Sequence, residues 1–79
     1  MEDEITELSL DIQVELMTAC EKFPAIHSAH EAYGVLAEEM AEFFDEVRKS
    51  PRKRDDDAMR HELIQIAAMA MRAIIDLEL

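Results

Sequence analysis

Three glutamates, Glu39, Glu42 and Glu62, are spaced so that two helices can bring their carboxylates together. Glu39 and Glu42 lie three residues apart and therefore share one side of a helix. Glu62 falls about 40° from Ile66 on a second helical pattern, at the edge of an apolar face. If the two helices pack antiparallel, the carboxylates converge at an apolar boundary, where their charge is unfavourable unless it is neutralised. The spacing therefore indicates a cation site.

The chemistry of the candidate ligands narrows the choice of cation. Ligand sets of oxygen atoms without thiolates suit Mg²⁺ or Mn²⁺ better than Zn²⁺. A simpler interpretation is that these glutamates form the solvent-facing side of amphipathic helices, as glutamates usually do. The positions of Glu39 and Glu62 at boundaries of apolar faces favour the cation site over that interpretation.

The segment Gly34–Val47 holds five carboxylates, which a helical wheel divides into two groups. Glu38 and Asp45 point toward water, nearly opposite the apolar stripe. The second group lies on the flank nearer Phe43 and consists of Glu39, Glu42 and Glu46. The apolar stripe, which we expect to form core, centres on Leu36, Met40 and Val47 and also contains Tyr33.

Three helical segments must position these residues. Apolar residues repeat at three- and four-residue steps from about Glu4 to Lys22, which predicts a first helix over this range. Pro24 ends this helix. The second helix is predicted over about Ile26–Lys49 and the third over about Ala58–Leu77, with Pro51 breaking the pattern between them. Acidic residues suit the start of the third helix as caps and dipole partners, namely Asp55, Asp56 and Asp57.

The third segment is apolar on two faces, and its only polar strip consists of His61, Glu62, Gln65, Arg72 and Asp76. A helix of this kind must be covered on both faces. Two further helices from a chain of 79 residues do not suffice, so we expect self-association, into a dimer or a tetramer. The predicted fold is all-α. A long antiparallel helical hairpin and an N-terminal helix form a single domain over residues 1–79, which assembles into an oligomeric helical bundle.

Composition supports this fold class and excludes several functions. One Gly and two Pro leave little material for turns, which favours helices over β structure. The net charge of −11 argues against nucleic-acid binding. Arg72 and Asp76 interrupt the last apolar stretch, so no membrane span is expected. The single Cys20 and the acidic start "MEDEITE", which does not resemble a signal peptide, predict a cytoplasmic location.

The motif "EEMAE" (Glu38–Glu42) followed by "ELIQ" (Glu62–Gln65) resembles the E-E-x-x-E … E-x-x-D signature of MazG-like, all-α nucleoside triphosphate pyrophosphohydrolases. The segments "HEAYGVLAEEMAEFFDEVRK" and "MRHELIQIAAMAMRAIIDL", roughly half of the chain, look like the two core helices of that superfamily. The resemblance implies a homo-oligomeric helical bundle that uses Mg²⁺ to cleave a (d)NTP into a (d)NMP and pyrophosphate.

Carried over by position, the resemblance makes three glutamates metal ligands: Glu39, Glu42 and Glu62. Glu38 and Glu39 are the catalytic candidates, with Glu38 as an outer ligand or as a helper in orienting water. Gln65 departs from the motif, which has Asp there. Its carbonyl oxygen can bind Mg²⁺ but is neutral, and Glu46 is a candidate to compensate. The departure leaves open an active enzyme with an altered metal shell, a weak enzyme, or a relative that kept the fold and lost the chemistry.

The basic run "RKSPRKR" is a candidate for contacting triphosphate oxygens, through Arg52, Lys53 and Arg54. A solvated linker whose charge favours the C-terminus of the preceding helix is the simpler interpretation. The alternative function for the whole chain is a non-catalytic helical interaction or regulatory module, whose acidic side is only a solvated surface.

Overall fold

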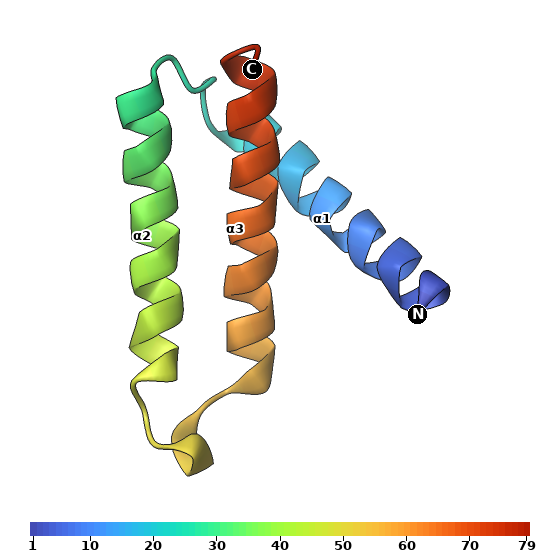
Figure 1. Cartoon of the computed structure of the whole chain (residues 1–79), viewed down its shortest axis with the longest axis vertical. Helices are drawn as coiled ribbons and strands as arrows, with labels where there is room; N and C mark the ends of the chain where they lie inside the picture. Colours follow the sequence, from blue (N-terminus) through green and yellow to red (C-terminus); the bar gives the residue numbers. More distant parts are fainter.

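The computed structural model describes all 79 residues and contains three α-helices and no strand. These are α1 (Glu2–Lys22), α2 (Ala29–Val47) and α3 (Asp56–Asp76). α2 and α3 form an antiparallel hairpin, which a linker with the short 3-10 helix η1 (Pro51–Lys53) closes (Figure 1). α1 crosses at an angle, and α3 is the helix against which both others pack. The predicted all-α class is confirmed.

Side-chain caps fix where the two hairpin helices begin. The hydroxyl of Ser28 accepts a hydrogen bond from the Glu31 N–H at 3.0 Å, so α2 begins at Ala29 and not near Ile26 as predicted.

None of the three helices combines the length and the apolar run that a membrane crossing needs.

Asp55 caps α3 as predicted, and Asp56 and Asp57 lie in the first turn of the helix. Asp55 Oδ1 accepts from the backbone N–H groups of Asp57 and Ala58, at 3.0 and 3.1 Å. These bonds satisfy donors that the first turn of a helix leaves open. The helix therefore begins at Asp56, ahead of the predicted start at Ala58.

A buried arginine on α3 holds the end of α1. Arg72 is only 5% exposed, and its Nη1 and Nη2 donate to the carbonyl oxygens of Ala19 and Phe23 at 3.0 and 2.8 Å. Its Nε pairs with Asp76 Oδ2 at 3.1 Å, and the same oxygen accepts from the Ile26 N–H at 2.8 Å. The Arg72–Asp76 pair thus satisfies the Phe23 carbonyl, which α1 leaves open at its end. It also adds a second hydrogen bond to the Ala19 carbonyl, which already accepts from the Phe23 N–H at 3.0 Å, and it anchors the connection to α2.

The polar strip of α3 faces the other helices. All its members except His61 are half-buried or buried. Large apolar residues of the same helix are exposed instead, namely Leu63, Met71, Ile74 and Ile75. In this helix the usual distribution, with apolar residues inside and charged residues outside, is partly reversed.

On α2, too, the predicted core stripe is only partly covered within one chain, with Leu36 and Val47 half-buried. Tyr33 is 77% exposed and Met40 52% exposed, so the prediction that they form core is wrong for a single chain. The side of α2 with the least exposure contains Ala32, Glu39 and Glu46. This side packs against α3, and it carries carboxylates into the contact between the two helices.

Replacing Arg72 by alanine is expected to lower the free energy of unfolding by about 3–5 kcal/mol, because the carboxylate of Asp76 loses its only cationic partner in a largely buried place. The Phe23 carbonyl also loses its hydrogen bond with Arg72. Urea denaturation followed by circular dichroism measures this change. Arg60→Ala is the matched control, since Arg60 pairs with Asp11 at 2.7 Å but both side chains are more than half exposed. The control is expected to change the free energy by no more than about 1 kcal/mol. Equal losses in the two variants would contradict the role given to Arg72.

Candidate metal centre

The carboxylates of Glu39 and Glu42 on α2 and of Glu62 on α3 meet between the two helices. One oxygen of each lies within 4.8 Å of the corresponding oxygens of the other two. Oxygens bound to one Mg²⁺ lie about 3–4 Å apart, so small side-chain movements suffice to close this glutamate trio (Glu39, Glu42 and Glu62) around an ion. The structure therefore brings together the residues that the sequence spacing predicted to converge.

Crowding and burial raise the pKa of two members of the trio. The pKa of Glu39 is raised mainly by partial burial and further by neighbouring carboxylates, Glu42 first among them. The pKa of Glu62 is raised by burial and by a hydrogen bond and repulsion with Glu42, against the opposing effect of His61. The ionised trio therefore opposes folding unless a proton or a cation neutralises it.

The side-chain amide of Gln65 adjoins the trio. One end of the amide lies 3.0 Å from Glu39 Oε2 and 3.2 Å from Glu62 Oε2, and the other end lies 3.3 Å from His61 Nε2. With its nitrogen toward the carboxylates, the amide donates to both of them. With its oxygen toward them, it adds a fourth oxygen to the ligand set. Gln65 therefore adjoins the trio in either orientation of its amide.

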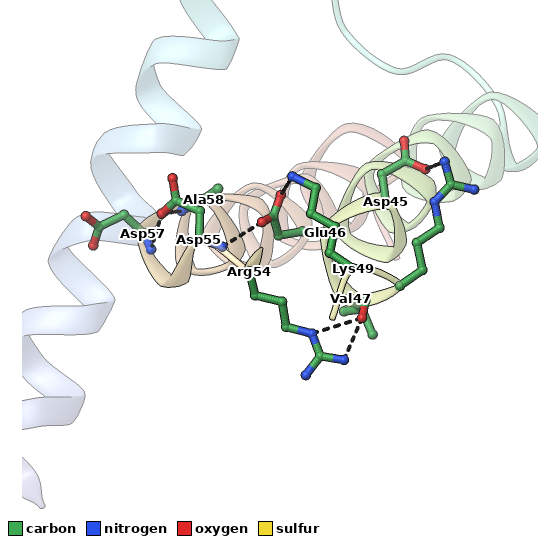
Figure 2. A network of polar contacts seen from close by, with 9 residues as sticks. Asp45, Glu46, Val47, Lys49, Arg54, Asp55, Asp57 and Ala58 are labelled. Carbon is green, nitrogen blue, oxygen red and sulfur yellow. Dashed lines mark hydrogen bonds and ion pairs between the residues drawn. The ribbon is translucent and has the colours of Figure 1, made fainter. Parts of the chain in front are cut away.

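Glu46 does not join the trio. Its Oε2 accepts from Lys49 Nζ at 2.7 Å, and its Oε1 accepts from the Asp55 backbone N–H at 2.6 Å (Figure 2). These hydrogen bonds, first that of Lys49 and then that of Asp55, hold the pKa of the Glu46 carboxyl below its ordinary value. Glu46 therefore joins the end of α2 to the cap of α3, and this placement does not fit the predicted role as a compensating ligand.

The predicted phosphate-binding residues lie on the turn that closes the hairpin. Arg54 donates from Nε and Nη2 to the Val47 carbonyl oxygen, at 2.9 and 2.6 Å (Figure 2), so its guanidinium caps the end of α2. Arg52 and Lys53 are exposed on η1. Two of the three basic residues thus remain accessible to an anion.

Glu38, the remaining predicted site residue, is exposed beside the trio. Together with Glu39 it borders a cavity of about 280 Å³, whose other walls include Phe23, Met69 and Arg72. Sequence reasoning did not find this cavity, because it depends on how the end of α1 meets the hairpin. In the sequence, the only indication of this cavity was the polar residue Arg72 within an otherwise apolar stretch.

No protein-family model, curated protein or solved structure matches this chain. The resemblance to MazG-like enzymes therefore remains a prediction from the motif and the two helical segments. What the structure adds is the convergence of three carboxylates and one amide between antiparallel helices.

The shifted pKa values predict how stability depends on pH without divalent cations. Glu39 and Glu62 have raised pKa values in the folded state. Their contribution to the stability of the fold is therefore fully present below the ordinary Glu pKa and is lost as pH rises through the raised values. The pKa of Glu46 is lowered in the folded state. Its contribution to the stability of the fold is therefore present above the ordinary Glu pKa and is lost as pH falls through the lowered pKa.

Glu39→Gln is therefore expected to raise the Tm at neutral pH in the presence of a chelator by a few degrees. Glu46→Gln, which weakens the contact with Lys49, is expected to lower it. Thermal melts followed by circular dichroism at several pH values measure both effects. A lower Tm for Glu39→Gln under these conditions would show that the trio is not repulsive.

Proposed function

We propose that this chain is a Mg²⁺-dependent hydrolase that cleaves a nucleoside triphosphate between the α and β phosphates, as the MazG-like resemblance implies. The observation that carries the proposal is the convergence of Glu39, Glu42 and Glu62 between α2 and α3. Carboxylate and amide oxygens are the donors that Mg²⁺ takes in proteins, and Mn²⁺ takes the same set. The chemistry of the residues therefore fits the ion that the resemblance implies.

Each residue has a role in this proposal. The trio holds the ion, with the Gln65 oxygen as a fourth donor. When bound, Mg²⁺ neutralises phosphate charge and activates water. Glu39, the catalytic candidate among the three ligands, accepts a proton from the attacking water, since a carboxylate within hydrogen-bond reach of that water can act as a general base. Glu38 helps to orient that water.

The basic turn completes the proposed site. Arg52 and Lys53 are exposed and can contact the outer phosphates, since both residue types bind phosphate oxygens. Arg54 was predicted to share this role, but its guanidinium already binds the end of α2. We therefore assign the phosphate contact to Arg52 and Lys53 alone.

A non-catalytic helical module is the alternative function, and one observation favours it. With its nitrogen toward the trio, the Gln65 amide donates to Glu39 and Glu62 and accepts from His61. This arrangement partly satisfies the carboxylates without any ion. Mg²⁺ binding distinguishes the two functions, because the module needs none.

Addition of Mg²⁺ is expected to raise the Tm. At ten times Kd, binding to the folded state alone stabilises it by about 1.4 kcal/mol, which corresponds to about 6–11 °C for a domain of this size. Glu39→Gln and Glu62→Gln are expected to lose most of this shift and the release of pyrophosphate from mixed dNTPs. Asp45→Asn is the control, because Asp45 is exposed and pairs only with Arg48.

Two outcomes would contradict the metal proposal. One is a wild-type chain whose Tm does not respond to Mg²⁺ and that releases no pyrophosphate. The other is an Asp45→Asn variant that loses the response as fully as Glu39→Gln does, since the effect would then reflect total charge and not the trio.

We further propose that the chain functions as a homo-oligomer. It exposes 6099 Å², whereas a folded monomer of its mass exposes about 4,900 Å². The excess of about 1,200 Å² is larger than the roughly 800 Å² that each partner buries in a standard interface. Large apolar side chains are exposed on all three helices, among them Val14, Met17, Phe44 and Ile74. A second copy of the chain offers the same apolar surface and so can cover it.

A charge on this surface is expected to dissociate the oligomer. Phe44→Glu replaces a side chain that is 59% exposed with a carboxylate, which would lose its water in an interface. Size-exclusion chromatography with light scattering should show an oligomer for the wild type and a shift toward the monomer for the variant. Thr6→Glu, on an exposed position of α1, is the charge-matched control. A monomeric wild type would contradict the proposal.

A further inference from the structure

The cavity beside the trio combines an apolar wall with an acidic rim. Its volume is about 280 Å³, and it shares Glu39 with the trio. Its apolar wall comes from Phe23, Ile26, Val35 and Met69, and its rim from Glu31 and Glu38. The residues come from α2, α3 and the connection that follows α1, so the cavity forms where that connection packs on the hairpin.

The cavity, the trio and the basic turn follow one another along the hairpin. On α2 the cavity residues Glu31 and Val35 come first, Glu39 and Glu42 next, and the turn with Arg52 last. At 1.5 Å per residue, Val35 and Glu42 lie about 10 Å apart along the helix. This is the scale of a nucleotide, so a triphosphate bound at the trio can place its nucleoside in the cavity and its outer phosphates toward the turn.

The size of the cavity and its charge restrict what can bind there. The volume lies just below the usual range for small-molecule sites, which suits a nucleoside and not a whole triphosphate. The only cation in the wall, Arg72, already donates to Ala19, Phe23 and Asp76. The carboxylates on the rim accept hydrogen bonds and donate none when ionised. An anion is therefore disfavoured, and a neutral planar group with N–H donors fits.

We propose that this cavity binds the base of the nucleoside triphosphate and selects bases with an exocyclic amino group, that is cytosine, adenine or guanine. Glu31 accepts a hydrogen bond from the amino group, and the exposed ring of Phe23 offers a face for stacking. Uracil and thymine present carbonyl oxygens where cytosine presents its amino group, and a carboxylate repels those oxygens. The assignment rests on the proposed function, because the phosphates must be held at the trio.

The test is equilibrium binding of non-hydrolysable dCTP and dUTP analogues and of inorganic tripolyphosphate to the full chain, in the presence of Mg²⁺. The dCTP analogue is expected to bind about tenfold more tightly than the dUTP analogue, since a hydrogen bond to a charged acceptor corresponds to at least about that factor in Kd. Tripolyphosphate, which has no base, is expected to bind more weakly than the dCTP analogue.

Glu31→Gln examines the acidic rim without removing the cap. Glu31 Oε2 accepts from the His27 N–H at 3.2 Å, and a glutamine oxygen can keep that bond. The amide also donates, so the preference for dCTP over dUTP is expected to fall severalfold, while the Kd of tripolyphosphate stays unchanged. Glu7→Gln, on an exposed position of α1, is the matched control and should keep the preference.

Val35→Phe narrows the cavity and gives an independent measurement. The Kd of the dCTP analogue is expected to rise to that of tripolyphosphate, while Mg²⁺ still raises the Tm. Equal affinities for the two nucleotides, or an unchanged ratio in Glu31→Gln, would overturn the base assignment and leave the metal proposal standing. If neither nucleotide nor tripolyphosphate binds with Mg²⁺, the proposed function fails, and this inference fails with it.

Discussion

Repulsion between carboxylates in the contact between α2 and α3 is the constraint on which the rest of the structure depends. Helical hairpins usually fill such a contact with apolar side chains, whereas here Glu39 and Glu62 occupy it and their pKa values are raised. The hairpin must therefore be held by contacts elsewhere. At its closed end Glu46 binds Lys49 and the backbone of Asp55, and at the other end the Arg72–Asp76 pair binds the chain that leaves α1.

The same constraint explains the unusual distribution of polarity. Because charged residues occupy the inner sides of α2 and α3, much of the apolar surface of these helices faces outward, including Met40 and Ile74. Only eight of the 79 residues are buried, and chains of this length form small cores that stabilise a fold only marginally. Self-association and cation binding would relieve two different deficits of the same fold. Self-association would cover the exposed apolar surface. Cation binding would neutralise the carboxylates that occupy the contact between α2 and α3 in place of apolar residues.

Periodicity sufficed to predict three helices and the meeting of Glu39, Glu42 and Glu62, because helical geometry fixes which side chains share a face. It did not predict that Tyr33 and Met40 would be exposed, since a wheel places the most apolar side inward and contains no information on partner chains. The hydrogen bonds of Glu46 were also out of reach. They depend on the path of the linker, which has no periodic signal, and on Asp55, whose capping role was predicted while its contact with Glu46 was not.

A trio that binds Mg²⁺ differs from a merely acidic helix surface in one property, because it exchanges protons for the cation. Calorimetric titration with Mg²⁺ at mildly acidic pH, repeated in buffers of different ionisation enthalpy, measures ion binding and proton release together. Because the pKa values of Glu39 and Glu62 are raised, we predict saturable binding accompanied by proton release, both reduced in Glu39→Gln. Absence of a saturable Mg²⁺ heat, or binding without any proton release, would contradict it.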